Sequence, residues 1–434
     1  MFTTTQWSTL SAQAQAALLM RPAIADNETL SAQVCDIINQ VRDKGDETLL
    51  ALTKKFDGIA LSELAVSQQQ VKQAVASLSE SRLAALEKAY SQIKSFHQAQ
   101  TFQEISVETS PGVVCQLKSE AIDSVGLYIP AGTAPLPSTV LMLGVPAQIA
   151  NCRRRVLVSP PDSEGNIAPE VLAAAQLCGI EEIYAVGGAQ AIAALALGTD
   201  SIAPVNKVFG PGNSYVTEAK KQLSQQVPGF AIDMPAGPSE VLVLADETAN
   251  AQFVAADLLS QAEHGSDSQV VLVATNNQII EQVQAATLAQ LSQLSRKEIA
   301  KASLAHARFI LVDSLEKAVD VSNQYAPEHL IVQTQSPRDL VGKLRNAGSI
   351  FLGKYTPESA GDYASGTNHV LPTYGYSKVV SSLSLADFSR RYTVQEISQQ
   401  GLAALAPCLI ELTDAEGLDA HQRAVTIRLD GQED

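Results

Sequence analysis

The pattern of apolar and polar residues changes once along the chain, near residue 124. In residues 1–100, apolar side chains recur three or four positions apart with polar residues between them, which predicts helices with one buried face. The clearest example is 66–100, whose apolar positions are Val71, Val75, Leu78, Leu83, Leu86, Ile93 and Phe96. Beyond residue 124, short apolar runs bounded by Gly and Pro alternate with helical stretches, as in buried parallel strands joined by crossover helices.

The expected strands form two groups of five. The first group is 125–129, 156–159, 183–186, 208–209 and 231–234, and the second is 241–245, 270–274, 309–312, 330–333 and 350–352. Two such groups predict an α/β protein with two doubly wound domains of similar build. Two prolines and a glycine mark the joint in 233–240. After residue 371 the alternation fades, and the tail is expected to be helical, with too few apolar residues for a core.

Composition and charge exclude several classes of protein. The net charge is −16, and the one compact basic run, 153–155, leads into an expected strand, so no nucleic-acid partner is predicted. No apolar run approaches the ~20 residues that span a bilayer, and residues 1–10 lack the pattern of a secretion signal. The five cysteines lack paired spacing, which indicates the reducing cytoplasm; they are Cys35, Cys115, Cys152, Cys178 and Cys408.

Few of the six histidines are candidates for chemistry. His97 and His306 are interpreted as ordinary surface or boundary residues. Gln261 and His264 lie three apart at the end of a helix expected over 250–263, so both side chains leave one face. They could hold one cation together, but such pairs more often simply end a helix.

Two further segments carry acidic and imidazole groups. Glu328 and His329 directly precede an expected strand and could form an acid/base pair, or lie in a solvated loop. The Gly- and Ser-rich stretch 356–373 reads as a long loop beyond a strand and contains Glu358, Asp362 and His369. Asp362 is a candidate oxygen ligand, and from the residues alone Glu358 is nearly as good.

Evidence for nucleotide binding is limited to two glycine-containing segments. No G-x-G-x-x-G follows a strand, but Gly187-Gly188 and the segment 210–213 each follow an apolar run and open a helix. Either could present backbone N–H groups to a phosphate, or could be a tight turn between strand and helix.

Taken together, long and unusual motifs in this chain resemble the histidinol dehydrogenase family over about residues 21–428. The matching stretches are 125–130 (VGLYIP), 186–195 (VGGAQAIAAL), 209–213 (FGPGN), 232–241 (IDMPAGPSEV), 259–265 (LSQAEHG), 325–330 (YAPEHL) and 359–369 (SAGDYASGTNH).

The resemblance implies a role for each candidate. Zinc would be bound by Gln261, His264, Asp362 and His421, without excluding cobalt or manganese. Glu328 and His329 would be the catalytic acid/base pair. NAD would contact Tyr128, Gln190 and Asn213. The substrate would contact Ser239, Gln261, His264, His329, Asp362, Glu416 and His421. The tail would cross to the neighbouring subunit, so each active site would be shared within a homodimer.

The implied reaction oxidises L-histidinol to L-histidine through the aldehyde with two NAD⁺. His329 would take the alcohol proton, and Glu328 would activate the water that hydrates the aldehyde. The corresponding division is an N-terminal tail (1–25), a first α/β domain with the zinc and catalytic residues (26–123 plus 237–370), a second on the NAD side (124–236) and a swapped helical tail (371–434).

Three alternatives remain open at this point. A zinc hydrolase would use similar ligands and a nearby glutamate. A histidine or nucleotide sensor would bind without turnover, and would leave the pairing of Glu328 with His329 unexplained. A cysteine thiohemiacetal is a rival route for the aldehyde step, but Cys115 and Cys152 stand beside no histidine.

Overall fold

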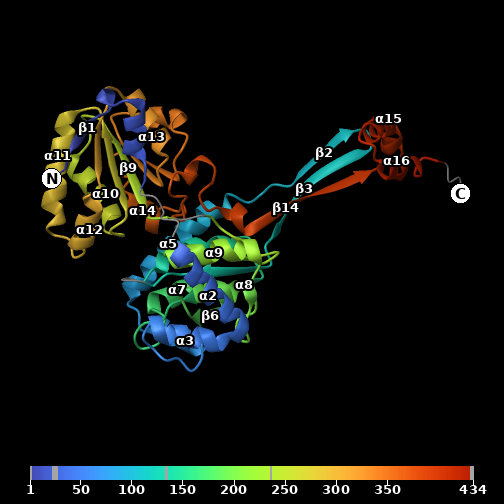
Figure 1. Cartoon of the computed structure of the whole chain (residues 1–434), viewed down its shortest axis with the longest axis horizontal. Coiled ribbons are helices and arrows are strands. Elements are labelled where there is room, and N and C mark those ends of the chain that lie inside the picture. The colour runs from blue at the N-terminus through green and yellow to red at the C-terminus, as the bar shows by residue number, and fades with distance from the viewer. Residues whose placement is uncertain (1, 22–27, 132–134, 235–236, 431–434) are drawn as a thin grey trace. The chain divides into compact units, whose positions relative to one another are not determined.

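The computed structural model describes residues 2–21, 28–131, 135–234 and 237–430, and the chain divides into two compact units. Unit 1 comprises residues 1–100 and 123–388, and unit 2 comprises residues 101–122 and 389–434. Unit 1 contains two parallel sheets, and unit 2 contains one antiparallel sheet with two helices (Figure 1). The expected boundary at residues 25–26 lies outside the described residues.

The first sheet of unit 1 has five parallel strands in the order β6-β5-β4-β7-β8. They are β4 (Ser124–Tyr128), β5 (Arg154–Ser159), β6 (Glu182–Ala185), β7 (Lys207–Phe209) and β8 (Ala231–Ile232), joined by α6 (Pro137–Ile149), α7 (Pro169–Leu177), α8 (Gly188–Leu197) and α9 (Ser214–Gln226). All five strands of the first expected group are confirmed; β4, β5, β6 and β7 are short apolar runs with mostly buried side chains, whereas β8 is partly exposed.

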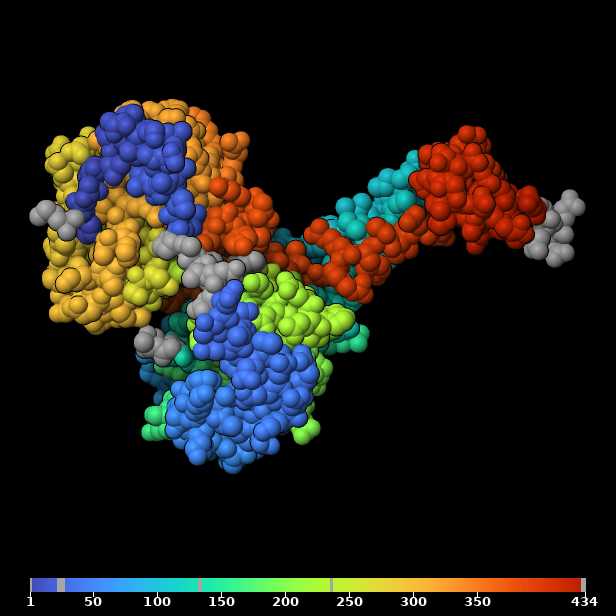
Figure 2. Space-filling model, viewed as in Figure 1, coloured from blue at the N-terminus to red at the C-terminus, as the bar shows by residue number. Residues whose placement is uncertain are grey.

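The N-terminal helices pack against this five-stranded half. They are α2 (Glu28–Lys44), α3 (Asp46–Phe56), α4 (Gln68–Ala76) and α5 (Glu80–Gln98), and one core joins side chains of α2 and α3 to those of α8 and α9. Figure 2 shows the blue N-terminal helices over the green segments of that half. The packing therefore differs from the expected division, which grouped residues 26–123 with 237–370. An amphipathic helix can bury its apolar face against either sheet, and the periodicity of its sequence does not reveal which sheet that is.

Two details of this region differ from expectation. The expected helix 66–100 is two helices, because Ser77 ends α4 and Ser79 caps α5 by accepting a hydrogen bond from the amide of Arg82. His97 on α5 is fully buried, whereas a surface or boundary position was expected. Its Nδ1 lies 2.9 Å from the carbonyl oxygen of Ile93, and its Nε2 lies 3.3 Å from the amide nitrogen of Asn368.

The second sheet of unit 1 has six parallel strands in the order β1-β11-β10-β9-β12-β13. They are β1 (Thr4–Gln6), β9 (Glu240–Ala245), β10 (Gln269–Ala274), β11 (Arg308–Leu311), β12 (His329–Gln333) and β13 (Ser349–Leu352). The five strands expected here are confirmed, and β1 adds a sixth at the edge. The helices are α1 (Ala12–Leu19), α10 (Ala251–Ala262), α11 (Asn277–Leu291), α12 (Lys297–Leu304), α13 (Leu315–Tyr325) and α14 (Glu358–Tyr363).

Unit 2 contains strands that the sequence pattern did not predict. Its antiparallel sheet is β2 (Ile105–Ser110), β3 (Val113–Ala121) and β14 (Ser389–Ile397), accompanied by α15 (Gln399–Ala415) and α16 (Asp419–Thr426). The tail is therefore not helical throughout. In β14 eight of nine residues are exposed, so the strand has no buried face to impose a period of two on its sequence.

Short 3-10 helices complete the described chain at Trp7–Thr9, Pro337–Lys343, Tyr376–Lys378 and Leu385–Phe388. None of the described helices combines the length and apolar character that crossing a bilayer requires.

Candidate active site

The expected acid/base pair lies where β9 and β12 begin. The strands are parallel neighbours, with His329 opposite Val241, so Glu328 and His329 meet Glu240 at the amino edge of the sheet. The amide of Glu240 donates to Oε2 of Glu328 at 2.8 Å, and Nδ1 of His329 lies 3.1 Å from the carbonyl oxygen of Glu240. Both side chains are buried, and the backbone of a single residue holds them.

An ion pair fixes Glu240 itself. The guanidinium of Arg21 binds the fully buried carboxylate of Glu240 through two nitrogens and stacks 4.0 Å from the centre of the Tyr325 ring. It also donates to the carbonyl oxygens of Tyr325 and Ala326, just before Glu328 and His329. Arg21 therefore ties the starts of both strands together, and the sequence analysis gave it no role.

The hydrogen bond at Nδ1 identifies the reactive nitrogen of His329. A carbonyl oxygen can only accept, so Nδ1 carries a proton. No hydrogen-bond partner lies within reach of Nε2 among the described residues, although a carboxylate oxygen of Asp362 is 3.6 Å away. Nε2 is therefore the nitrogen that can take a proton from a bound molecule.

The segment 356–373 was expected to be a loop but contains α14. Glu358 and Asp362 are four residues apart on this helix, so their carboxylates leave one face. Oxygens of Glu358 and Glu328 lie 3.9 and 3.7 Å from Nδ1 of His329. Three carboxylates consequently surround one imidazole, whereas the sequence analysis weighed Asp362 against Glu358 as alternatives.

Burial and this charge cluster shift the proton affinities strongly. Burial raises the pKa of Glu328 to about 7 and that of Glu358 to about 8, although the charge of His329 opposes both shifts. For His329, burial disfavours the charged form, but the carboxylates of Glu358, Glu328 and Asp362 outweigh it and raise the pKa well above the ordinary value. Glu328 and Glu358 therefore change protonation near neutrality, which suits them to acid/base chemistry, whereas the surrounding carboxylates favour the charged form of His329.

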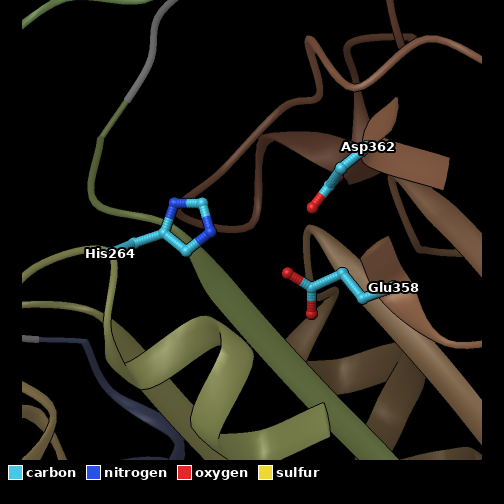
Figure 3. Close-up of side chains that lie close together, drawn as sticks. All are labelled: His264, Glu358 and Asp362. Carbon is cyan, nitrogen blue, oxygen red and sulfur yellow. The ribbon is translucent and has the colours of Figure 1, made fainter. Parts of the chain in front are cut away.

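A metal-type cluster adjoins this pair. The ligand atoms of His264, Glu358 and Asp362 lie within 4.8 Å of one another, and the three side chains converge on one space (Figure 3). His264 follows the end of α10, which returns antiparallel to β9 and so ends at the amino edge of the sheet. One imidazole and two carboxylates are a donor set that divalent transition metals accept.

Gln261 fits the same cluster. It is fully buried on α10, three residues before His264, and neither amide atom has a hydrogen-bond partner in the described chain. A buried amide without partners is costly unless a ligand or metal satisfies it. The buried carboxyl of Asp257 lies one turn earlier on that face and accepts from the amide of Gln333 at 3.0 Å.

The remaining expected substrate residues lie apart in the chain. Ser239 directly precedes β9, beside Glu240. Glu416 is the C-cap residue of α15 and His421 lies on α16, both exposed in unit 2. His421 is thus absent from the cluster that the described residues of unit 1 form.

The three residues expected to contact NAD share one cavity of about 720 Å³ in the five-stranded half. Tyr128 ends β4, Gln190 lies in the first turn of α8, and Asn213 caps α9, so all stand at the carboxyl edge of the sheet. The hydroxyl of Tyr128 accepts from the amide of Gly188 at 3.2 Å, and Oε1 of the buried Gln190 has no partner among the described residues. Helices α2 and α3 form the opposite wall.

From the sequence Glu358 was an alternative to Asp362 rather than its companion, and neither Arg21 nor the α2–α3 wall was recognised. A signal for Glu358 existed, because its spacing of four from Asp362 places both on one helical face; the glycines and serines around them concealed the helix. Arg21 gave no signal, since its partner Glu240 is 219 residues away.

One parallel sheet has a cavity at the start of α8, and the other has a buried imidazole–carboxylate centre beside metal-type ligands. These features are typical of α/β enzymes that combine a nucleotide site with acid/base chemistry. Comparison with known proteins identifies the family. The family model for histidinol dehydrogenase matches residues 20–429.

Relatives and a solved structure agree with that match. The chain is 68% identical to the histidinol dehydrogenase of Colwellia psychrerythraea (strain 34H) and 59% identical to that of Vibrio vulnificus (strain YJ016), each over 98% of both proteins. The crystal structure of histidinol dehydrogenase from Elizabethkingia anophelis is 45% identical, covers 98% of both chains and superposes with a TM-score of 0.95. The chain belongs to the histidinol dehydrogenase family, and it is an NAD-dependent oxidoreductase.

Proposed function

We propose that this enzyme oxidises L-histidinol to L-histidine through L-histidinaldehyde, reducing two NAD⁺, in the last steps of histidine biosynthesis. Membership of the family supports the substrate. The observation that carries the chemistry is the buried His329, whose Nδ1 is held by a carbonyl while its Nε2 faces the site without a partner. In this arrangement the neutral form of His329 takes the alcohol proton at Nε2 as hydride leaves the carbon.

Glu328 is the proposed activator of water in the second oxidation. An aldehyde lacks the second oxygen of the acid and must be hydrated before the second hydride leaves. A carboxyl whose pKa is about 7 holds and releases a proton near neutrality, and the amide of Glu240 fixes its orientation. Glu358 and Asp362 counterbalance the charge that His329 gains on taking the proton.

A resident zinc ion is proposed at Gln261, His264 and Asp362, with His421 as the fourth ligand. The orphaned amide of Gln261 and the convergence of His264 with Asp362 support the fit. The ion would orient and polarise the substrate without itself undergoing redox change. Cobalt and manganese accept the same donors.

The cofactor is assigned to the cavity lined by Tyr128, Gln190 and Asn213. The N-cap residue of α8, Gly187, has no side chain; the hydroxyl of Tyr128 accepts from the amide of Gly188, and the amides that follow in the first turn would be available to the pyrophosphate. The six-stranded half would supply the chemistry and the five-stranded half the cofactor.

A homodimer with shared sites is proposed because unit 2 lacks a core. Among its described apolar side chains, only Val113 and Ala406 are buried. Large ones stand exposed on its strands and helices: Ile105, Val107, Tyr392, Val394, Ile397, Leu412, Leu418 and Ile427. Such a surface is typical of a segment that another copy covers. Glu416 and His421 would thereby reach a neighbour's Ser239, His329 and zinc ligands.

The test is the stoichiometry of NADH and metal. With excess NAD⁺, each molecule of limiting L-histidinol is expected to yield two NADH. The enzyme should lose this activity after chelation and regain it when zinc is added. One NADH, or full activity in metal-free protein, would contradict the proposal.

A further inference from the structure

The wall of the cavity opposite the glycine segments carries acidic groups that nothing above uses. Helix α2 contributes Gln33, Asp36, Ile37 and Gln40, and α3 contributes Leu52, Lys55, Phe56 and its C-cap residue Asp57. The wall therefore carries two carboxylates and one ammonium group. A dinucleotide in the cavity would have these groups as neighbours.

Asp57 is the carboxylate without a committed partner. Its Oδ2 is buried, and no hydrogen-bond donor reaches it among the described residues. Burial raises its pKa, as expected for a carboxyl that has lost water and gained no donor. Its charge also acts on Tyr128, raising the pKa of that phenol after the larger effect of burial. Asp57 therefore stands near the hydroxyl that accepts from Gly188 at the start of α8.

This position fits a ribose next to the pyrophosphate. The uncapped start of α8 is the natural site for the phosphates. In dinucleotide-binding folds a carboxylate beside that site accepts from the ribose hydroxyls, and a 2′-phosphate there meets like charge.

The position of the α2–α3 wall also indicates which of the two riboses of NAD lies beside Asp57. Helices α2 and α3 pack against α8 of the five-stranded half. The nicotinamide must reach the amino edge of the six-stranded half, where His329 lies. The α2–α3 wall is consequently left for the adenosine end of the cofactor.

We propose that Asp57 binds the hydroxyls of the adenosine ribose and makes the enzyme select NAD⁺ against NADP⁺. The proposal rests on the assignment of NAD to this cavity. Asp57 gains donors when NAD⁺ binds, whereas a 2′-phosphate would place a second anion against a partly desolvated carboxylate.

Asp36 provides a matched control on the same wall. It carries the same charge, but it is exposed and its carboxylate already accepts from the amide of Gln40 at 2.6 Å. If the total charge of the wall sets selectivity, both aspartates act alike. If a specific contact sets it, only Asp57 does.

The experiment compares kcat/KM for NAD⁺ and NADP⁺ in the full-length, zinc-loaded enzyme and in Asp57→Asn and Asp36→Asn. Asp57→Asn is expected to lower kcat/KM for NAD⁺ about 10-fold and to raise the NADP⁺/NAD⁺ ratio about 30-fold or more, since a charged acceptor and a repulsion are both lost. Asp36→Asn is expected to change the ratio less than about threefold, because exposed charges are screened. The melting temperature of Asp57→Asn should be no lower than that of the wild type, because burial disfavours the charged carboxylate of Asp57 in the folded protein.

Two outcomes overturn the proposal and are distinguishable from each other. The proposed role of Asp57 is wrong if Gln190→Ala raises the KM for NAD⁺ while Asp57→Asn leaves the NADP⁺/NAD⁺ ratio of kcat/KM unchanged. It is also wrong if Asp36→Asn changes that ratio as much as Asp57→Asn does. If neither Gln190→Ala nor Asp57→Asn changes either constant, the assignment of NAD to the cavity fails as well.

Discussion

The two halves of unit 1 have the same strand order but carry candidate sites on opposite edges. Numbered within each half, both sheets read 3-2-1-4-5, with β1 added outside the second. In the five-stranded half the cavity lies at the carboxyl ends of the strands, as is usual for open α/β sheets. In the six-stranded half the buried pair lies at the amino ends. Topology alone therefore does not locate the chemistry.

Helix caps explain much of this difference. In the six-stranded half Asn250, Asn276 and Ser314 cap α10, α11 and α13 with side-chain oxygens, which occupy the amides at the carboxyl edge. In the five-stranded half the N-cap residue of α8 is Gly187, which has no side chain, and among the described residues the hydroxyl of Tyr128 accepts from the first amide, that of Gly188. A capped helix start has less to offer a phosphate, which supports the start of α8 as the proposed phosphate site even though Asn213 caps the neighbouring α9.

The largest effect is expected at the amino edge, from His329→Asn. Losing the proton acceptor should lower kcat by about 1,000-fold, within the range known for general-base residues. NADH formation from L-histidinol measures it, and thermal unfolding checks the fold. His306→Asn, at an exposed histidine, is the control. A loss below about 10-fold would remove His329 from the chemistry.

Glu328→Gln should affect the second oxidation most. The amide keeps the size of the side chain but cannot accept a proton, so turnover of L-histidinaldehyde should fall about 100-fold. The first hydride transfer, measured as a pre-steady-state burst of NADH from L-histidinol, should fall much less. Full turnover of the aldehyde would show that Glu328 does not activate water.

Two asparagine caps compare the carboxyl edges directly. Asn213 caps α9 in the cavity, and Asn250 caps α10 in the other half; each accepts from two amides. Replacing either by alanine should cost about 1 kcal/mol of unfolding free energy. Only Asn213→Ala should also raise the KM for NAD⁺, by roughly 10-fold for a lost hydrogen bond. Equal KM values in the two variants would contradict the assignment of the cofactor.

The smallest effect concerns His97, which is buried between α5 and Asn368. Burial lowers its pKa below 6.5, so the folded state binds fewer protons than the unfolded chain. Its contribution to stability is therefore full above that pH and is lost as the pH falls below it. Urea unfolding at pH 7.5 and 5.5 should show a smaller difference in His97→Gln than in wild type. An unchanged difference would show that His97 does not contribute.

The sequence predicts the sheets far better than the site. Ten strands were recognisable as short apolar runs, most of them buried on both faces as in a parallel sheet between helices. Strand β14, exposed along its length, lacks that constraint and was missed. Of the site, Gln261 and His264 were recognisable as one helical face. The convergence of His264 with Glu358 and Asp362, and the anchoring of Glu240 by Arg21, depend on contacts between distant segments that local patterns do not encode.

The central claim is that the site at the amino edge of one copy is completed by unit 2 of another copy. The direct measurement mixes two inactive variants, His329→Asn and His421→Asn, by denaturing and refolding them together in equal amounts. With shared sites, half of the dimers are mixed and each contains one intact site, so activity should reach about a quarter of wild type. If every site were complete within one chain, the mixture would stay as inactive as the separate variants.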